Sequence, residues 1–409
     1  MRKNKKGETK NETSGGMRVV VFGAGVLCQL RAQADFKLAG REVQMHSFAS
    51  EGVIYTNNNN YLTMNTTDGA SFTDMGVVLS SRITSRLRVG AQVYDRDIGH
   101  LQQWHPNLDW ASVDYSFSDA FGVRGGKVKT ALGLYNQTQD LEFGQTWALM
   151  PQAVYPLDLR SRTLTHTGLD LYGRIRLSRA GGLMYTVYAG KRPNDTRDGI
   201  YYAWGFLGYP NTSFSGKMAG TDLRWKPPIR NLMVGGSYAA INDKYHFIDL
   251  SSGPVPVAGT LDSTHMWIAS AYGEYSRGRW RFDSEYRRNM AIYWQVDPSP
   301  GQTETWWYSD KGWFASVVYQ AKPRLEIGTY HDRYYFDHWS LPDPSTHYIR
   351  DQALTLHYTF THYMGAKVEG HVMDGTGDMW SSHEFYLANN PGGLLPRTKM
   401  LVARIGFSF

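Results

Sequence analysis

Basic residues recur in this 409-residue chain at positions two apart. Because successive side chains of a β-strand point to opposite faces, this spacing places both members of a pair on one face. Guanidinium and ammonium groups on the wall of a narrow, water-filled passage attract anions and select them over cations. The residues that we expect to do this chemistry are Arg86, Arg88, Lys127, Lys129, Arg174, Arg176, Arg224, Arg279 and Arg281. The alternative is that such residues pair with acidic neighbours across strands and only stabilise the wall.

A second group of charges lies in a long segment, about residues 133–165, that follows the two lysines. The middle of this segment, residues 147–151, is apolar and poorly suited to open water. We expect the segment to fold back against the basic wall as a constriction loop, with carboxylates that oppose the basic residues. Its charged residues are Asp140 and Glu142 near the start and Arg160 and Arg162 near the end. The alternative is an external flap that packs on its neighbours.

Residue types that could catalyse a reaction are present, but their spacing does not indicate catalysis. His166, His331, His357 and His371 form no recognised nucleophilic arrangement with a serine and a carboxylate. Residues 57–60 and 374–378 carry oxygen ligands that suit calcium, but neither has the spacing of an EF-hand loop. We interpret both as solvated loops. We therefore expect no enzymatic activity, no catalytic residue, no metal site and no cofactor.

The basic pairs lie in segments whose polarity alternates residue by residue. Leu169, Leu171 and Ile175, for example, alternate with Asp170, Arg174 and Arg176. The charged face cannot meet lipid, because each Arg or Lys at the bilayer midplane would cost about 2–4 kcal/mol. The sequence predicts sixteen such strands, at residues 43–55, 70–82, 85–97, 108–118, 121–132, 166–178, 182–192, 217–227, 230–242, 263–276, 279–293, 305–320, 323–336, 350–361, 364–374 and 398–409.

The connections between these segments alternate between two kinds. One kind is a tight turn, as at residues 83–84 and 277–278, and the other is longer and rich in Asn, Asp, Gly, Pro and Ser, as at 56–69 and 375–397. Short turns at one end and long loops at the other are typical of a transmembrane β-barrel. The sequence therefore predicts an all-β fold, a closed sixteen-stranded antiparallel barrel. A soluble β-sandwich or propeller is the alternative, but it would not require this regular alternation.

The amino-terminal residues predict secretion. Six basic residues precede the apolar run 19–30 and the small residues of Ala32-Gln33-Ala34, which is the pattern of a signal peptide over residues 1–34. Met17 is an alternative start, and a buried strand is the alternative structure. Residues 35–409, the predicted barrel domain, hold 36 basic and 35 acidic residues and no cysteine. The basic character of the chain mostly comes from the leader and gives no support to nucleic-acid binding.

The last nine residues alternate apolar side chains with small or charged ones and end in Phe409. Leu401 and Phe407 share one face of the strand that we expect there, and Arg404 lies on the other. Taken alone, these residues could equally form the edge strand of a soluble sheet. After fifteen similar segments, we expect the last strand of a barrel, with Phe409 as a terminal signal for its assembly.

Residues 126–136, the layout of sixteen strands and the closing aromatic strand together resemble bacterial outer-membrane porins of the general and phosphate-selective types. The resemblance covers the whole predicted barrel in architecture, rests on short motifs and identifies no solute. It implies an integral protein of the Gram-negative outer membrane, in contact with lipid and lipopolysaccharide and inserted by the barrel-assembly machinery. It also implies a homo-oligomer, such as a trimer.

From these features we expect a porin through which small hydrophilic solutes and ions diffuse passively, with a mild preference for anions. The first alternative is a substrate-specific channel for acidic or aromatic solutes, which its loop Trp and Tyr residues would capture. The second alternative is a structural or adhesive barrel that does not conduct. A receptor with an amino-terminal plug would need more chain than is present.

Overall fold

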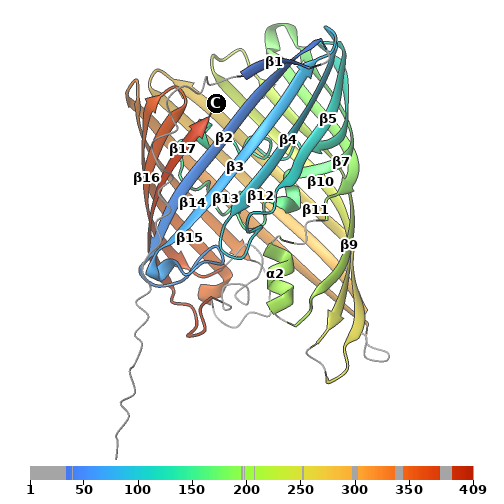
Figure 1. The fold of residues 1–409 in the computed structure, drawn as a ribbon, viewed down its shortest axis with the longest axis vertical. Helices are drawn as coiled ribbons and strands as arrows, with labels where there is room; N and C mark the ends of the chain where they lie inside the picture. Colours follow the sequence, from blue (N-terminus) through green and yellow to red (C-terminus); the bar gives the residue numbers. More distant parts are fainter. Residues whose placement is uncertain are drawn as a thin grey trace, which may run out of the picture. The chain divides into compact units, whose positions relative to one another are not determined.

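The computed structural model describes residues 34–38, 40–194, 197, 199–206, 208–250, 253–296, 303–336, 344–377 and 389–408. Except for Ala34, the predicted signal peptide lies outside these residues, as does Phe409. The described chain forms one closed barrel of long tilted strands (Figure 1). The short helices are η1 (Thr66–Asp68), η2 (Glu142–Gly144), α1 (Ser161–Leu164), η3 (Ser178–Ala180), α2 (Gly199–Phe206) and η4 (Pro344–His347).

Sixteen antiparallel strands form the wall of the barrel, each paired with its neighbours in sequence. They are β2 (Arg41–Thr56), β3 (Ala70–Arg82), β4 (Leu87–Asp97), β5 (Asn107–Ser118), β6 (Phe121–Lys129), β7 (Thr165–Arg176), β8 (Gly182–Arg192), β9 (Asn211–Lys226), β10 (Leu232–Asp249), β11 (Val257–Arg277), β12 (Trp280–Val296), β13 (Thr303–Lys322), β14 (Leu325–Phe336), β15 (Tyr348–Thr361), β16 (Met364–Gly375) and β17 (Arg397–Ser408). The barrel closes because β17 pairs with β2, with Arg404 opposite Gly52. The predicted fold is therefore confirmed.

A further short strand, β1 (Ala34–Leu38), precedes the barrel and pairs with residues 41–45 of β2. It lies beside the part of β2 that β17 leaves uncovered, since β17 pairs with β2 only from Phe48 onward. Its position next to the carboxy-terminal end of β17 is visible in Figure 1. β1 thus covers backbone groups of β2 that would otherwise form an open strand edge.

The outward faces of the strands are apolar. In β12, Phe282 and Tyr286 point outward and are exposed, while Asp283, Glu285 and Arg287 point inward and are buried. The same alternation leaves a belt of exposed aliphatic side chains around the barrel, which include Val53, Leu79, Val93, Val113, Leu169, Val187, Leu223, Leu354, Val372 and Leu401. No helix among the described residues is long and apolar enough to cross a membrane. In lipid, only an α-helix and a closed β-barrel pair all of their backbone N–H and C=O groups by hydrogen bonds. A closed barrel with an apolar belt therefore spans a membrane.

Short and long connections lie at opposite ends of the barrel. Ser408 donates its backbone N–H to Tyr363 of a short turn, so the carboxy-terminal end of β17 lies at the short-turn end. Exposed aromatic residues flank these turns and form a girdle, in which Phe117 stacks on Phe121 and Trp280 contacts Tyr319. Such girdles mark the interface between hydrocarbon and water.

Several strands extend further toward the long loops than the sequence pattern indicates. Residues 243–249 continue β10 and residues 257–262 begin β11, although the alternation predicted a loop there. The cause is a β-bulge between Ile241 and Lys244, where the register against β11 shifts. A bulge adds an unpaired residue and interrupts the period of two, so the strand beyond it cannot be recognised as a continuation.

Candidate functional site

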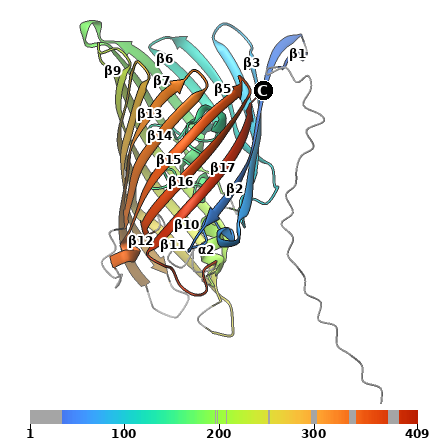
Figure 2. The same cartoon turned by 90° about the vertical axis from the view of Figure 1, so that its left-hand side faces the viewer.

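The segment between β6 and β7, residues 130–164, lies inside the barrel and is named the lumen loop. The predicted strand 121–132 ends at Lys129, so the loop begins slightly earlier than expected. The loop reaches strands on different sides of the wall: Gly133 donates its N–H to Ser237 Oγ of β10 at 2.8 Å, and Arg96 of β4 donates to the Leu157 carbonyl oxygen at 2.6 Å. Figure 2 shows this teal and green segment within the ring of strands. These contacts place the loop in the lumen and not on the outside of the barrel.

Carboxylates of the wall accept hydrogen bonds from the loop backbone. Glu369 of β16 accepts the N–H groups of Ala148 at 3.0 Å and Leu149 at 2.9 Å. Glu285 of β12 accepts the N–H of Leu134 at 2.9 Å and also binds the Tyr155 hydroxyl. Both glutamates are buried. They satisfy loop donors that would otherwise be buried without partners.

Cationic side chains of the wall bind the other half of the loop backbone, its carbonyl oxygens. Arg287 of β12 donates to Val154 at 2.7 Å, and Lys367 of β16 donates to Trp147 at 3.0 Å. The other donors are Arg96 to Leu157, Arg192 to Arg162, Arg224 to Gly133 and Arg404 to Ala148. Many inward charges therefore hold the loop, and they do not form a free surface for ions.

Two of the four charged residues predicted in the loop, Asp140 near its start and Arg160 near its end, lie close to each other. Asp140 accepts a hydrogen bond from Lys129 Nζ at 2.6 Å and lies 3.7 Å from Arg160, whose guanidinium also binds Asp109 at 2.9 Å. Burial by itself would raise the pKa of the Asp140 carboxyl, but Lys129 and Arg160 hold it below its usual value of 3.8. Gln92 of β4 donates to the same carboxylate at 2.5 Å. The result is a charge-paired clasp that joins the loop to β4, β5 and β6.

The two other predicted loop residues have different environments. Arg162 lies in α1 and is buried, and its carbonyl oxygen accepts hydrogen bonds from Arg192. Glu142 lies in η2, and its side chain is outside the described part of the structure. Neither residue is therefore seen to face an opposite charge across an aqueous passage, as the predicted constriction requires.

The apolar middle of the loop packs on the wall. Trp147 is buried and its ring meets that of Tyr330 of β14 edge to face, with centroids 5.0 Å apart. Gly328 on the same strand makes room for this ring, because a Cβ atom there would lie 2.7 Å from Trp147 Cζ3. The sequence 147–151 is apolar because it fills the inside of a barrel.

Two cavities remain between the lumen loop and the short-turn end, and arginines and aspartates are both among the residues that line them. One has a volume of about 450 Å³ and is lined in part by Arg124, Arg174 and Arg224. The other, of about 370 Å³, is lined in part by Arg88 and Arg124. Arg124 pairs with Asp114 at 2.8 Å and Arg224 with Asp222 at 2.8 Å. Among the described residues, Arg88 and Arg174 have no carboxylate within 4.0 Å.

The remaining predicted wall residues are distributed differently. Arg281 faces the lumen, where it pairs with Asp283 at 3.1 Å and donates to Thr146 Oγ1 at 2.7 Å. Arg86, Arg176 and Arg279 lie at the exposed short-turn rim, and Arg176 is 3.9 Å from Asp119. Their position at the strand ends, where the barrel meets water, accounts for their exposure.

The prediction of a luminal Lys127 is wrong. Lys127 lies opposite Ala111, on the same face as the exposed Val113, and donates to the Leu108 carbonyl oxygen at 2.6 Å. The inward face of β6 is the one that carries Arg124 and the buried Val128. Lys129 shares the alternation of Lys127 but lies at the end of the strand, where its side chain reaches Asp140.

An aromatic and aliphatic cluster fills part of the lumen toward the long-loop end. Leu132 and Leu159 of the lumen loop pack in one cluster with inward-facing Tyr245 and Tyr293 of the wall, and Trp204 of α2 packs against it. Trp204 stacks on Tyr245 with centroids 5.4 Å apart. The two ends of the lumen therefore differ. The short-turn end contains cavities that arginines help to line, and the long-loop end contains packed aromatic and aliphatic side chains.

A hydroxyl, an imidazole and a carboxylate do occur in sequence near the loop. Thr130 Oγ1 lies 3.0 Å from His166 Nδ1, and His166 Nε2 lies 2.9 Å from Asp170. All three side chains are fully buried, so solvent and substrate do not reach the hydroxyl. The chain of hydrogen bonds fixes the start of the loop to β7. Among the described residues no group of three or more His, Cys, Asp or Glu side chains is placed to hold a metal ion.

The asparagine run 57–60 joins two long loops by hydrogen bonds. Asn59 donates to the Leu395 carbonyl oxygen at 2.6 Å, and Asn60 to that of Asn389 at 2.8 Å. Its amide groups are used in holding residues 389–399 to β2. Residue Asp378 of the other calcium candidate lies outside the described residues.

Sequence reasoning missed the role of the wall charges that bind the loop. Glu285, Glu369, Arg287 and Arg404 lie at inward positions that the period of two does predict. Their partners, however, are backbone N–H and C=O groups of a distant loop, which every residue carries and no sequence pattern marks. The sequence signal for this role was the number of charged residues at inward positions, which is larger than a narrow aqueous passage can accommodate.

Comparison with known proteins shows the same fold. No protein-family model and no curated protein sequence matches the chain. Similar solved structures include the outer membrane channel DcaP of Acinetobacter baumannii (TM-score 0.56, 10% identity, 92% of this chain and 100% of that one). They also include OmpF of Salmonella typhi in complex with daunomycin (0.56, 11%, 92% and 100%) and an anion-selective porin from Comamonas acidovorans (0.53, 10%, 90% and 99%). The chain therefore has the fold of the bacterial outer-membrane porins.

Proposed function

We propose that this protein is an integral outer-membrane channel through which small hydrophilic solutes diffuse passively. The observation that carries the proposal is a closed sixteen-stranded barrel with a loop bound to its inner wall and a cavity of about 450 Å³ between that loop and the short-turn end. Barrels of sixteen to eighteen strands are wide enough to hold an aqueous passage. The lumen loop is the constriction of this channel, and the neighbours of the same fold include porins and an outer-membrane channel.

The proposed channel prefers anions mildly, because of two arginines and not because of the whole basic wall. Arg88 and Arg174 face the cavities at the short-turn end and have no carboxylate partner among the described residues. Arg124 and Arg224 are paired there and contribute little net charge. Guanidinium groups without a carboxylate neighbour raise the local concentration of anions in the passage that they line.

Recordings from the purified protein in planar lipid bilayers test the proposal. With potassium chloride more concentrated on one side, we expect ion conductance and a reversal potential of the sign that anion flow produces. A reversal potential of the opposite sign would contradict the anion preference but not the channel. Absence of conductance from folded, inserted protein would contradict the channel and favour a structural or adhesive barrel.

A second candidate function is a substrate-specific channel, which the apolar long-loop half of the lumen favours. Tyr245, Tyr293 and Trp204 belong to an aromatic cluster between the long loops and the lumen loop. A passage lined in this way would slow hydrated ions and would bind a solute with an apolar face. Saturable block of the ion current by one class of solute supports the specific channel, whereas equal, unsaturable effects across many solutes support general diffusion.

The proposed channel is not an enzyme, and its other partners follow from its location. The chain would enter the periplasm by way of the signal peptide 1–34 and insert with the help of the barrel-assembly machinery, for which Phe409 is the proposed signal. Lipid and lipopolysaccharide would surround its apolar belt, and a trimer is the oligomer that we propose. Deletion of Phe409 should lower outer-membrane insertion, and normal insertion of that variant would refute its role.

A further inference from the structure

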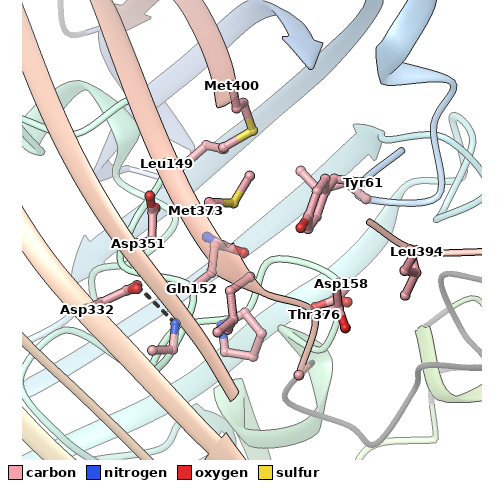
Figure 3. A pocket seen from close by; sticks show the side chains of 15 residues that line it. Tyr61, Leu149, Gln152, Asp158, Asp332, Asp351, Met373, Thr376, Leu394 and Met400 are labelled. Carbon is pink, nitrogen blue, oxygen red and sulfur yellow. Dashed lines mark hydrogen bonds between the residues drawn. The ribbon is translucent and has the colours of Figure 1, made fainter. Parts of the chain in front are cut away.

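A separate cavity lies on the long-loop side of the lumen loop, and its lining combines apolar side chains with carboxylates. Its volume is about 60 Å³. Figure 3 shows Met373 and Met400 of the wall, Leu149 of the lumen loop and Tyr61 of a long loop around it, with Asp332 and Asp351 at one end. A third carboxylate, Asp158 of the lumen loop, lines the cavity away from this pair. The cavity is thus lined by apolar side chains and by carboxylates, two of which stand together at one end.

The two carboxylates stand directly opposite each other on neighbouring strands, Asp332 on β14 and Asp351 on β15. Like charges in this position repel each other and destabilise the strand pair. Both residues are buried, with relative exposures of 1% and 6%. Burial in a medium of low polarity strengthens the repulsion.

Positive charge near these carboxylates does not balance them. His371 of β16 lies 2.7 Å from Asp351 and 3.1 Å from Glu369, so its single charge, when it is protonated, is shared between two carboxylates. Asp332 accepts the backbone N–H of Ala153 at 3.2 Å and has no cationic partner within 4.0 Å among the described residues. One imidazole cannot balance Asp351 and Glu369 together, so negative charge remains beside the cavity.

One carboxylate oxygen of this group makes no hydrogen bond in the part of the chain that the structure describes. Asp351 Oδ2 is bound by His371, but Asp351 Oδ1 is buried and has no hydrogen-bond partner among the described residues. A buried carboxylate oxygen without a donor destabilises the fold, and a ligand that supplies a donor would remove this unfavourable free energy. Because Asp351 lines the cavity, a group bound there is placed to supply it.

We propose that this cavity binds a small organic cation, with its ammonium group at Asp351 and Asp332 and its alkyl part against Met373, Met400 and Leu149. An ammonium group supplies up to three N–H donors and the positive charge that the site lacks. The methionines suit a short alkyl chain of variable shape, because their side chains adapt to irregular surfaces. A volume of about 60 Å³ accepts a group of a few heavy atoms and excludes a sugar or a nucleotide.

The role of this site rests on the proposed channel function, because a cation bound there would occupy the lumen on the long-loop side of the constriction. The site is distinct from the anion-attracting arginines, which lie on the other side of the lumen loop at the short-turn end. A cation held at the long-loop end would obstruct the passage without changing the charge of the short-turn end. Block of the current and ion selectivity are therefore separable measurements.

The test compares three probes of nearly equal size and different charge: n-propylammonium, 1-propanol and propionate. Binding to the detergent-solubilised full chain is measured by isothermal titration calorimetry, and block of the potassium chloride current is measured in planar bilayers. We expect n-propylammonium alone to bind and to block saturably. The variant Asp351→Asn should weaken both effects at least tenfold. Asp68→Asn, the same change at an exposed residue of a long loop, should leave them unaltered.

The outcomes separate this inference from the proposed function. A protein that conducts potassium chloride but binds the three probes equally, or binds none, overturns the cation site and leaves the channel intact. Calorimetric binding of n-propylammonium that Asp351→Asn abolishes, in a protein without conductance, supports the site and refutes the channel. If heat-modifiable electrophoretic mobility shows that Asp351→Asn does not fold, Asp332→Asn replaces it, because its amide oxygen still accepts the Ala153 N–H. Undiminished binding by that variant overturns the site.

Discussion

Arg404 of β17 donates a hydrogen bond to the carbonyl oxygen of Ala148 at 2.9 Å, and the N–H of the same loop residue is accepted by Glu369 of β16 at 3.0 Å. One residue of the lumen loop, Ala148, is thus held on both sides by opposite charges on two neighbouring strands. This arrangement recurs along the loop, with Glu285 and Arg287 of β12 bound to Leu134 and Val154. Alternating charges on the inner wall hold an irregular backbone that would otherwise lie in the lumen with unsatisfied polar groups.

Replacement of Glu369 by Gln should loosen the middle of the lumen loop. The carboxylate accepts two backbone N–H groups and the Thr355 hydroxyl, whereas an amide offers a single acceptor oxygen and turns donors toward its neighbours. We expect the free energy of unfolding in urea to fall by about 2–4 kcal/mol. The open-channel current should also become larger and noisier. Glu42→Gln, at an exposed position of β2, is the matched control and should change neither quantity.

A methyl group at position 328 should displace Trp147. The Cβ atom of Gly328→Ala would lie 2.7 Å from the Trp147 ring, and overpacking of this kind costs about 1–3 kcal/mol. We expect a lower unfolding midpoint and an altered single-channel conductance. The control is Gly370→Ala on β16, because a Cβ atom at that position has no heavy atom within 4 Å. It measures the effect of replacing a strand glycine by alanine without a steric clash. Equal effects of the two substitutions would show that contact with the loop is irrelevant.

Ion selectivity should depend on Arg88 and Arg174 together. In the double variant Arg88→Gln, Arg174→Gln, the reversal potential under a potassium chloride gradient should move toward the cation value, because the unpaired guanidinium groups of the cavities are lost. Arg179→Gln removes an exposed charge from η3 at the short-turn rim and should have little effect at physiological salt. A larger shift with Arg179→Gln would assign selectivity to the rim.

The two lysines of β6 should differ in their effects. Lys129→Gln removes the ammonium partner of the buried Asp140 carboxylate and should destabilise the loop clasp by about 3–5 kcal/mol, because it leaves one buried partner of an ion pair behind. Lys127→Gln changes an outward-facing residue that donates to the Leu108 carbonyl oxygen and not to Asp140, and it should leave loop stability and selectivity as they are. The measurement is urea unfolding, together with channel noise at neutral pH. Equal destabilisation by both variants would contradict the assignment of the Asp140 partner to Lys129 alone.

The contribution of Asp140 to stability should be lost only in acid. Lys129 and Arg160 hold the pKa of this carboxyl below its usual value of 3.8, despite its burial. A group whose pKa is lower in the folded state stabilises the fold above its unfolded pKa and loses that effect as pH falls through the folded value. The difference in unfolding free energy between the wild type and Asp140→Asn should therefore be constant from pH 7 to 5 and shrink below about pH 4. A difference that already shrinks between pH 7 and 5 would mean that the pKa is raised.

The wall of the barrel was predictable because its physical requirements act on single residues. Strands β3 and β8 coincide with the predicted ranges 70–82 and 182–192, since each alternates without interruption between lipid-facing and inward-facing side chains. The prediction failed where local geometry broke that alternation, as at the bulge after Ile241. It also misjudged Lys127, because charge alone does not tell which face of a strand is luminal.

The sequence by itself determined the alternation, the strand number and the distinction between short turns and long loops, because burial in lipid constrains every strand position separately. Only the tertiary structure decided what the inward charges do. Glu369, Arg404 and Arg287 meet backbone groups of a loop far away in sequence, and such groups are the same in every residue. Closure of the barrel brings them within hydrogen-bond distance and leaves Arg88 and Arg174 without a carboxylate partner in the described part of the chain. Charge on the wall is therefore a property of the sequence, but its division between holding the loop and facing solutes is a property of the fold.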